Sequence, residues 1–431
     1  MVAEVILWGK RIGAVSDAKG YVEFNYDSDF IDFAKYNNIQ LAPLAMPVNN
    51  TIYSFPELED QKPYFGLPGM LADSLPDSYG NKMITEYLDR YGNGRTSLSP
   101  IEKLCYTGKR GMGALEYKPV TVEANICSNI NLEELTILAE KILTKRKDIH
   151  ITENENAMKQ LLQVGSSAGG ARAKALIAWN ENTGEIRSGQ VDAGKGFGYW
   201  LLKFDRMTNN TDLEIKPDDI DSTKIEYAYY LMAQDAGLKM SECRLYEDGD
   251  CAHFITKRFD RTDEGKKIHM VSLCGMNHMN FRDRHVYGYK NVADVLDRIG
   301  LRKDIETIFR RMVFSDLTYN FDDHVKNTSF LMDRDGHWSL SPAYDVTFAY
   351  DKEGKFTNSH QMLINGKAFD VTPEDYIECG KKMKLTETRM KNIISEVQEA
   401  VKNFRKYSEI SKVREERMEY IEKLINRKLV F

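Results

Sequence analysis

A short polar segment, Asn320–Asn327, holds the residues whose types and spacing could transfer a phosphoryl group. It reads Asn-Phe-Asp-Asp-His-Val-Lys-Asn, so Asp322 and Asn327 are five residues apart, and Asp345 follows in Ser-Pro-Ala-Tyr-Asp. Phosphoryl transfer requires one carboxylate to orient the attacking hydroxyl and accept its proton. It also requires oxygen ligands that hold Mg²⁺ against the phosphates. The spacing predicts Asp322 in the first role and Asn327 and Asp345 in the second.

Several neighbouring residues admit more than one role. His324 could be a catalytic base, but its place between Asp322 and Asn327 favours packing and hydrogen bonding that fix Asp322. Asp323 is expected to be exposed. The alternative is that it supports the metal ligands without binding the metal itself. Asn365-Gly366 predicts a tight turn. The whole segment also fits a polar loop built on Asx turns, a common structure that performs no chemistry.

The elements that must position these residues change in character along the chain. Short apolar runs broken by turn residues predict an antiparallel sheet within residues 1–30. The middle of the chain predicts mixed elements at 80–91, 131–146, 155–164, 174–179, 199–204, 221–236 and 254–259, with Asp221 or Ser222 as the N-cap of one helix. The last part predicts helices at 291–299, 304–319, 385–403 and 408–428, and a hairpin within 328–340.

A glycine-rich segment and a strand lysine are the candidates for holding phosphate oxygens. Ser167–Lys174 contains small residues that let backbone N–H groups approach a phosphate, and Arg172 or Lys174 adds positive charge. Lys203 lies in an otherwise apolar strand, as the phosphate-binding lysine of protein kinases does. Glu226, in the next helix, is its candidate ion-pair partner. A plain turn and an exposed strand lysine remain the structural alternatives.

Two motifs, Asn-x-Asp-Asp-His-x-Lys-Asn and Leu-Ser-Pro-Ala-Tyr-Asp, together closely resemble the catalytic and metal-binding motifs of the HipA toxin kinases. Further segments resemble that family in the same order along nearly the whole chain: Phe24–Asp27, Ser167–Lys174, Leu202–Phe204, Glu226-Tyr227, Lys257–Arg261 and Gln361–Lys367. Together with the change from strands to helices, the resemblance implies an α+β, two-lobed kinase-like fold. We expect a β-rich subdomain over 1–120, a mixed N-lobe over 121–261 and a helical C-lobe over 262–431.

The same resemblance implies an ATP- and Mg²⁺-dependent serine/threonine kinase in which Asp322 is catalytic and Asn327 and Asp345 bind the metal. The residues expected to bind the nucleotide are Ser167, Gly169, Gly170, Ala171, Arg172, Lys174, Lys203, Lys257, Phe259, Asp260, His324 and Lys326.

Some of these residues have more specific expected roles by resemblance. The backbone of Lys257 and Phe259 would meet the adenine edge, and Asp260 would bond either locally or to the ribose. Ser167 would be the site of an autoinhibitory phosphorylation, with Ser166 beside it as the alternative.

In the family that the motifs resemble, the kinase is the toxin of a toxin–antitoxin pair. This implies a helix-turn-helix antitoxin of the HipB type, operator DNA bound mainly through that antitoxin, and a protein substrate such as an aminoacyl-tRNA synthetase. The net charge of −6, from 59 basic and 65 acidic residues, agrees with this, because an autonomous DNA-binding surface needs a concentrated basic patch. Six scattered cysteines, no signal peptide and no run of ~20 apolar residues predict a cytoplasmic protein without membrane contact.

Two other classes of function remain open on the residues alone. A kinase for a small molecule or a lipid head group would use the same phosphotransfer loop. A catalytically silent relative would serve only as an antitoxin-binding co-repressor. The complete set of Asp322, Asn327, Asp345 and Lys203 argues against the silent protein.

Overall fold

The computed structural model of the chain describes residues 1–91, 97–120, 172–205 and 221–429, and in addition residues 130, 132, 135 and 136. The chain forms two compact units. The first unit is built from 1–220, 246–271 and 331–337, and the second from 221–245, 272–330 and 338–431. The predicted catalytic and metal-binding motifs lie in the second unit, whereas the predicted phosphate- and adenine-binding residues outside them lie in the first.

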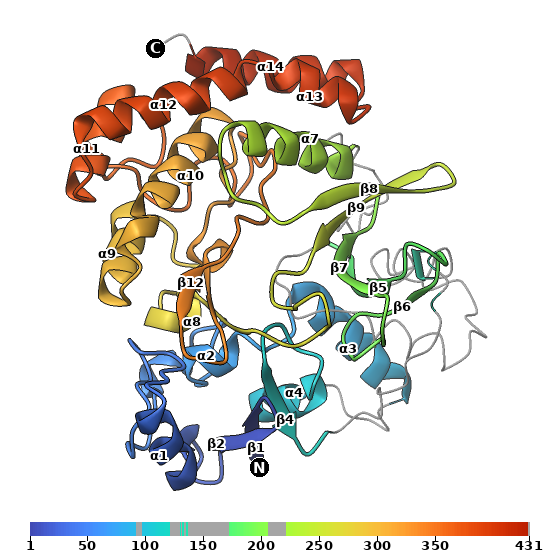
Figure 1. Ribbon diagram of the computed structural model, residues 1–431, viewed down its shortest axis with the longest axis vertical. Helices are drawn as coiled ribbons and strands as arrows, with labels where there is room; N and C mark the ends of the chain where they lie inside the picture. The colour runs from blue at the N-terminus through green and yellow to red at the C-terminus, as the bar shows by residue number, and fades with distance from the viewer. Residues whose placement is uncertain are drawn as a thin grey trace. The chain divides into compact units, whose positions relative to one another are not determined.

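A four-stranded antiparallel sheet opens the first unit (Figure 1). Its strands run in the order β3-β2-β1-β4 and are β1 (Val2–Leu7), β2 (Lys10–Ser16), β3 (Glu23–Tyr26) and β4 (Leu115–Lys118). Trp8 and Gly9 form the turn between β1 and β2 with positive φ angles of 49° and 83°, the backbone conformation that two-residue hairpin turns require. The antiparallel sheet predicted within residues 1–30 is therefore confirmed.

The first unit also contains a second sheet, with strands in the order β6-β5-β7-β9-β8. They are β5 (Lys174–Trp179), β6 (Ile186–Ser188), β7 (Gly198–Lys203), β8 (Cys243–Asp248, in this unit from Tyr246 on) and β9 (Cys251–Lys257). Trp200, Leu202 and Ile255 are buried on this sheet and pack with Tyr79 in one apolar core. The predicted strands 174–179, 199–204 and 254–259 correspond to β5, β7 and β9.

The helices of the first unit connect and flank its strands. They are α1 (Ser28–Tyr36), the 3₁₀ turn Pro56–Leu58, α2 (Gly69–Ala72), α3 (Ser78–Tyr91) and α4 (Pro100–Thr107), and the short strand β10 (His269–Ser272) follows β9. The side chain of Asp77 accepts the Gly80 N–H at 2.6 Å, which satisfies a free donor in the first turn of α3. The predicted helix at 80–91 is therefore confirmed as α3.

The start of α4 is held by a capping box. Ser99 accepts from the Glu102 N–H, while Glu102 accepts from the Ser99 N–H. We expect Ser99→Ala to lower the free energy of unfolding of the first unit by about 1 kcal/mol, because the substitution leaves a helix donor without its partner. Urea denaturation would measure this, with exposed Ser97→Ala as the matched control. Equal midpoints for both variants would contradict the prediction.

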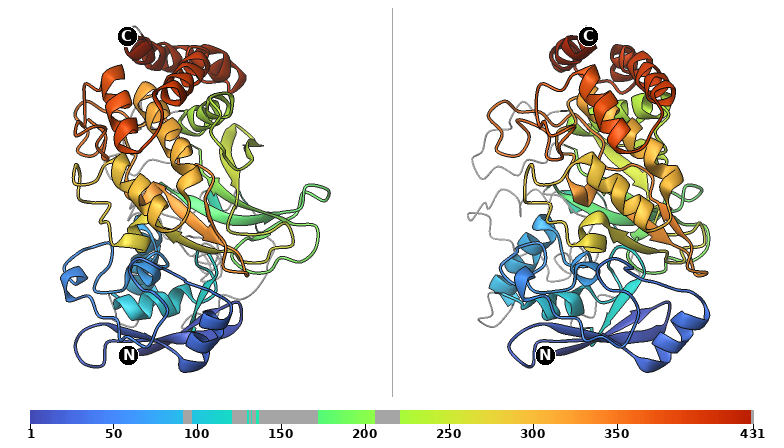
Figure 2. Two further views of the ribbon diagram at one scale, coloured as in Figure 1. Left: turned by 60° about the vertical axis from the view of Figure 1, so that its left-hand side comes forward. Right: turned by 90° about the vertical axis from the view of Figure 1, so that its left-hand side faces the viewer.

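The second unit is mainly helical (Figure 2). Its elements are α7 (Ser222–Asp235), α8 (Leu273–Asn277), α9 (Tyr289–Arg298), the 3₁₀ turns Arg302–Asp304 and Val325–Asn327, α10 (Ile305–Leu317), β11 (Ser329–Met332, in this unit up to Phe330), β12 (Trp338–Leu340), α11 (Pro373–Lys382), α12 (Glu387–Val401), α13 (Phe404–Ile410) and α14 (Glu415–Leu429). Helix α10 contacts α9, α12 and α14, and α7 contacts α12 and α13. Phe309, Met312 and Phe314 of α10 are fully buried. Because a helix that is apolar on several faces is buried within the core, α10 is the central helix of this unit.

Two expectations about the helices of the second unit are wrong in detail. The helix predicted at 408–428 is two helices, α13 and α14, because Lys412 adopts a positive φ of 56° and ends the first of them. Asp221 does precede α7, but its side chain does not cap that helix. Instead, its carboxylate accepts from the backbone N–H and the guanidinium of Arg414, in the connection between α13 and α14.

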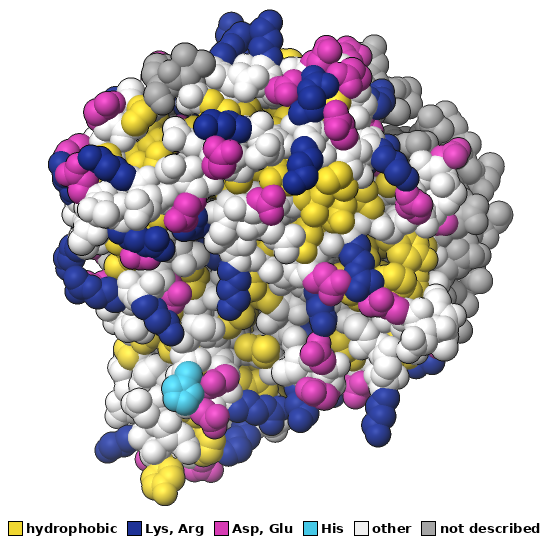
Figure 3. Space-filling model, turned by 45° about the horizontal axis from the view of Figure 1, so that its top comes forward, with side chains coloured by type: hydrophobic (Ala, Val, Ile, Leu, Met, Phe, Trp, Pro, Cys, Tyr) yellow, Lys and Arg dark blue, Asp and Glu magenta, His cyan; other side chains and the backbone are white. Residues whose placement is uncertain are grey.

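Charges of opposite sign are interspersed on the face drawn in Figure 3. The C-terminal helices also pair many of their charges, as Arg405 does with Glu415 and Glu422. Such a surface is not the concentrated basic patch that autonomous nucleic-acid binding requires. Among the residues described, no helix has both the length and the apolar content needed to cross a membrane.

Candidate active site

The segment after α10 turns sharply and carries Asp322 and Asn327 on one short loop. The side-chain Nδ2 of Asn327 donates to the backbone oxygen of Asp322 at 2.9 Å, and the Asn327 N–H donates to the His324 oxygen at 2.9 Å. The turn is thus closed by hydrogen bonds between its two ends. With its Nδ2 engaged, Asn327 keeps its amide oxygen as the group that can bind a cation.

Asp345 is tied to the same loop through its neighbour Tyr344. The Tyr344 hydroxyl donates to the Lys326 backbone oxygen at 2.7 Å and lies 2.6 Å from the Ser329 hydroxyl oxygen. Asp345 itself has a positive φ of 57°, a backbone conformation that is costly for most residues and recurs at functional sites. The hairpin between the two motifs therefore brings the chain back, as predicted, and places Asp345 near Asn327.

A cavity of about 40 Å³ lies beside these groups, and its lining includes Asn327 and Asp345. A water molecule needs roughly 10–15 Å³ of such space, so the cavity accommodates a small hydrated species. Arg311 and Asn320 also line it, and two guanidinium nitrogens of Arg311 and the amide oxygen of Asn320 are buried without a hydrogen-bond partner among the described residues. The Asn327 amide oxygen and the Asp345 carboxylate are the hard oxygen donors that Mg²⁺ prefers, so these residues fit that ion.

The Asp322 carboxylate is oriented but accessible. Gln361 Nε2 donates to its Oδ1 at 2.5 Å, and 44% of the side chain is exposed. Local burial raises the pKa of Asp322, and the nearby carboxylates of Asp345 and Asp323 raise it further, whereas His324 opposes them. An oriented carboxylate whose pKa is raised is a better proton acceptor than an ordinary surface aspartate.

His324 and Lys326 flank the catalytic aspartate and pack on one ring. The His324 ring centroid lies 5.1 Å from that of Phe281, and the Lys326 ammonium lies 5.4 Å from it. His324 Nε2 is 4.0 Å from Asp322 Oδ1, which is too long for a hydrogen bond. The predicted packing of His324 is therefore present, but its Nε2 makes no hydrogen bond to the Asp322 carboxylate.

Asp323 is not exposed, so the expectation for it is wrong. It is 6% exposed and accepts four hydrogen bonds. Its Oδ1 accepts from the Gln361 N–H at 2.8 Å and the Met362 N–H at 3.5 Å. Its Oδ2 accepts from the Tyr289 hydroxyl at 2.8 Å and from His360 Nδ1 at 2.7 Å. An ionised carboxylate can be buried when several donors satisfy it. Asp323 thus anchors the Asn320–Asn327 loop, whereas the side chain of its neighbour Asp322 is partly exposed.

His360 connects Asp323 to a second buried carboxylate. Its Nε2 lies 3.0 Å from Oδ1 of Asp316, on α10, and its ring is fully buried. Burial alone would lower the pKa of His360, but Asp323 and Asp316 outweigh it and raise the pKa to about 9. Asp316 also accepts from the Tyr376 hydroxyl at 2.5 Å and pairs with the Lys428 ammonium at 2.8 Å.

The buried network of Asp323, His360 and Asp316 was not predicted from the sequence. Two signals were available: an acidic residue, Asp316, within the apolar run of α10, and a histidine directly before the Gln361–Lys367 motif. The predicted turn at Asn365-Gly366, which lies in that motif, is confirmed, because both residues have positive φ and Ile364 and Lys367 exchange backbone hydrogen bonds.

The phosphate-site candidates of the first unit lie on adjacent strands. Lys203 on β7 pairs in register with Lys174 on β5 and with Phe254 on β9, and its ammonium lies 6.0 Å from the Phe254 ring. Arg172 is partly buried just before β5. Glu226, the partner proposed for Lys203, is buried in α7 of the second unit. Ser166, Ser167, Gly169, Gly170 and Ala171 lie outside the described residues.

Lys174 does not fit the predicted role of a phosphate ligand. Its ammonium is buried and pairs with Asp77 at 3.0 Å, where both side chains are 4% exposed or less. Removing the lysine from this contact would leave a buried carboxylate unpaired, which is strongly unfavourable. Lys174 therefore joins β5 to the start of α3.

The segment after β9 is built around a buried carboxylate. Asp260 is fully buried and accepts from Arg258, Arg261 and the Gly113 N–H. Burial would raise its pKa, but the two guanidinium groups outweigh burial and hold the pKa well below its usual range. The local role predicted for Asp260 fits this arrangement and the ribose-binding role does not, because the side chain is fully buried and both carboxylate oxygens already accept hydrogen bonds from Arg258, Arg261 and Gly113.

The two adenine-site candidates of this segment keep their positions at the end of β9. Lys257 is the last residue of β9 and pairs with Asp263 at 2.7 Å, and Phe259 is partly buried. The expected contact between their backbone and the adenine edge stays a prediction.

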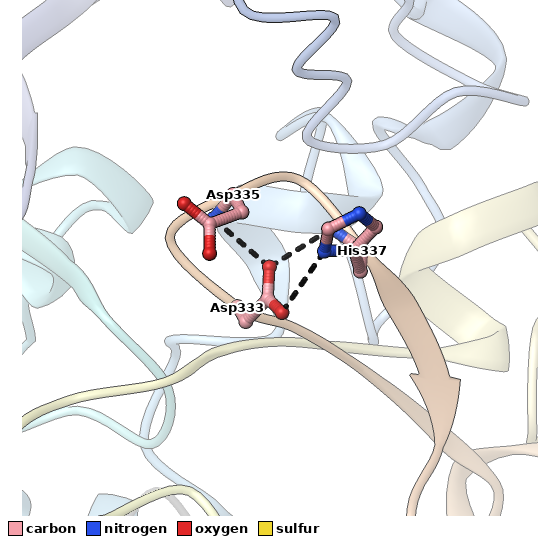
Figure 4. Close-up of side chains that lie close together, drawn as sticks. All are labelled: Asp333, Asp335 and His337. Atoms are coloured by element: carbon pink, nitrogen blue, oxygen red, sulfur yellow. Dashed lines mark hydrogen bonds and ion pairs between the residues drawn. The ribbon is translucent and has the colours of Figure 1, made fainter.

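A separate group of polar side chains lies at the predicted hairpin, in the first unit. Asp333 accepts from the Asp335 N–H and from the backbone and ring of His337, as Figure 4 shows. These side chains are exposed, and their oxygen and nitrogen atoms lie within 4.8 Å of one another. Their mutual hydrogen bonds account for the turn between β11 and β12.

Comparison with known proteins establishes the family. Residues 3–118 match the HipA N-terminal domain, and residues 166–404 match the HipA-like C-terminal domain. The chain belongs to the HipA family. A solved complex of HipA, HipB and operator DNA from Shewanella oneidensis contains a chain of similar fold, with a TM-score of 0.65 at 16% identity over 99% of this chain and 96% of that chain. The predicted α+β kinase-like fold is thereby confirmed.

Two curated relatives are similar over shorter regions. "Putative kinase Y4dM" of Sinorhizobium fredii is 32% identical over 161 residues, which are 36% of this chain and 38% of that protein. "Putative kinase" of Haemophilus influenzae is 29% identical over 106 residues, which are 21% of this chain and 29% of that protein. The matched regions thus span less than half the length of either relative.

Proposed function

We propose that this chain is an ATP- and Mg²⁺-dependent protein serine/threonine kinase that acts as the toxin of a toxin–antitoxin pair. The observation that carries the proposal is the closed loop in the second unit. There, Asn327 is hydrogen-bonded across the turn to Asp322, and Asp345 lines the same small cavity as Asn327. This is the arrangement of groups that phosphoryl transfer requires.

In the proposed reaction, Asp322 orients the substrate hydroxyl and accepts its proton. The hydroxyl oxygen forms a bond to the γ-phosphorus of ATP while the bond from that phosphorus to the leaving ADP oxygen breaks. Asn327 and Asp345 would hold Mg²⁺, which neutralises negative charge on the phosphates when bound. Gln361 keeps the Asp322 carboxylate in one orientation through its 2.5 Å hydrogen bond. Lys203, which lies on β7 in the first unit, is the candidate phosphate ligand.

The proposed partners follow from the family. The HipA of Shewanella oneidensis was solved with HipB and operator DNA. We propose that this chain likewise binds a helix-turn-helix antitoxin that contacts operator DNA. The proposed substrate is a protein, with an aminoacyl-tRNA synthetase as the first to test.

The central experiment is intact-mass analysis of the purified protein after incubation with ATP and Mg²⁺, beside Asp322→Asn. One added phosphate in the wild type alone would support the kinase. Phosphate incorporated from labelled ATP into proteins of a cell lysate would distinguish a protein kinase from a small-molecule or lipid kinase. No phosphate transfer to any of these acceptors, together with intact antitoxin binding, would favour a co-repressor without catalysis.

The proposed regulatory site is Ser167. Phosphorylation there would add about −1.5 to −2 charge in the glycine-rich segment, and we propose that this charge opposes the phosphates of ATP and switches the enzyme off. Peptide mapping of the phosphorylated protein should find the phosphate on Ser167 and not on Ser166. Full activity and nucleotide affinity of stoichiometrically Ser167-phosphorylated protein would contradict the regulatory role.

The metal ligands give a separate prediction. Asp345→Asn should raise the Mg²⁺ concentration needed for half-maximal activity by about 10–100-fold, the range seen for residues that support bound metals, because an amide replaces a charged ligand. A Mg²⁺ titration at saturating ATP measures this, with exposed Asp351→Asn as the control. An unchanged Mg²⁺ requirement would remove Asp345 from the metal site.

A further inference from the structure

A chain of four polar groups runs through the second unit from the catalytic loop to the last turn of α14. Asp323, in the loop, binds His360 at 2.7 Å. His360 binds Asp316 at 3.0 Å, and Asp316 binds Lys428 at 2.8 Å. Negative and positive groups alternate along it if His360 is an imidazolium. The first three are buried, and the side chain of Lys428 is only 11% exposed.

We propose that this Asp323–His360–Asp316–Lys428 relay is a positioning device, in which an imidazolium at His360 and the C-terminal helix hold the catalytic loop in its active conformation. The inference rests on the proposed kinase function. It extends that function to His360 and Lys428, which lie 38 and 106 positions after Asp322 in the chain.

The geometry requires a proton on both ring nitrogens of His360. Each nitrogen faces an oxygen of a buried carboxylate, and a neutral imidazole has only one N–H. His360 is fully buried, so a neutral ring would leave one carboxylate opposite a lone pair out of reach of solvent, and that arrangement is costly. The packing around the ring agrees, since its centroid lies 4.3 Å from that of Phe321. Phe321 is the residue directly before Asp322.

The remaining groups around the relay reinforce the same charge state. The Tyr376 hydroxyl of α11 donates to Asp316, and the Tyr289 hydroxyl of α9 donates to Asp323. His285 Nε2 lies 3.0 Å from the backbone oxygen of His360. Both tyrosines have a pKa raised well above the usual value, first by burial and then by these carboxylates, so they remain donors.

Asp322 connects the relay to catalysis because it is the neighbour of Asp323. The Gln361 backbone N–H binds Asp323, while the Gln361 side chain binds Asp322. A shift of Asp323 therefore moves both the loop and the group that orients the catalytic carboxylate. Misplacing a reacting group by ~1 Å costs roughly 10²-fold in rate, so loss of the relay should lower kcat and leave nucleotide binding intact.

The first test is steady-state kinetics on the full chain. We expect His360→Gln to lower kcat about 100-fold and Lys428→Met about tenfold, with the KM for ATP unchanged. Lys428→Arg should restore kcat, and Lys423→Met, an exposed lysine on the same helix, should match the wild type. A well-folded His360→Gln protein with normal kcat, or with a changed KM alone, would overturn the proposal.

The second test reads the charge of His360 directly and does not depend on kinase activity. In ¹⁵N-histidine-labelled protein, the signal lost in His360→Gln should show an imidazolium through pH 8. Because the folded-state pKa is raised to about 9 from 6.5, the stability that the protonated ring contributes is fully present below pH 6.5. It is lost as the pH rises through about 9. In Asp316→Asn the titration midpoint should move down toward 6.5.

The two tests separate the possible failures. If His360 is neutral at pH 7, the relay is wrong whatever the enzyme does. If His360 is protonated but the wild type transfers no phosphate to any acceptor, the proposed function fails, and the relay is a structural network only.

Discussion

Asp322→Asn is expected to reduce phosphate transfer by about 10²–10⁴-fold, the usual contribution of a positioned general base. The amide keeps the size of the side chain but cannot accept the proton of the substrate hydroxyl. The carboxylate is partly exposed and is held by Gln361 alone among the hydrogen bonds found for it, so the substitution should not unfold the second unit. Autophosphorylation and phosphate transfer to a protein acceptor both measure the effect.

The matched control for this variant is Asp333→Asn, an exposed carboxylate in the hairpin between β11 and β12. It removes the same charge from the chain and should retain wild-type activity. A melting temperature within about 2 °C of the wild type, a shift that corresponds to roughly 1 kcal/mol or less in units of this size, would show that Asp322→Asn is folded. Transfer at the wild-type rate by Asp322→Asn would refute the assignment of the catalytic residue.

Asp260→Ala is expected to destabilise the first unit by about 3–5 kcal/mol, the loss found when one partner of a buried ion pair is removed. Arg258 and Arg261 would remain, both buried, with their common counter-ion gone. The Gly113 N–H would also lose its acceptor. Urea denaturation should show a lower midpoint for the transition of the first unit, while the transition of the second unit stays in place.

Asp263→Ala provides the comparison for this second prediction. Asp263 lies only three residues after Asp260 and pairs with Lys257, but its side chain is 81% exposed. Exposed pairs contribute little to stability, so this variant should unfold at the wild-type midpoint. A similar loss in both variants would mean that burial is not what makes Asp260 important.

The local features of this protein could be predicted from its sequence. The spacing of Asp322 and Asn327 fixes both on one turn, because five residues leave little freedom in how the loop closes. Asn365-Gly366 is a turn through the left-handed conformation that asparagine and glycine tolerate. The helices predicted at 80–91, 221–236 and 304–319 are present as α3, α7 and α10.

The burial and the partners of charged residues depend on which distant segments come into contact in the fold. The spacing of residues along the chain contains no information about those contacts. Asp323 looked like a surface residue beside Asp322, but its burial is decided by Tyr289 and His360, which come from distant segments. Lys174 looked like a free cation at the end of a glycine-rich loop, and its partner Asp77 lies 97 positions earlier.

Residue types and short-range spacing are thus enough to specify a carboxylate, an amide oxygen and a second carboxylate in the motifs around Asp322, Asn327 and Asp345. Which charged residues are buried, and with which partners, depends on the tertiary packing. A buried charge persists only where an opposite charge or a hydrogen-bond donor reaches it, and those partners are brought together by the packing of elements far apart in the chain.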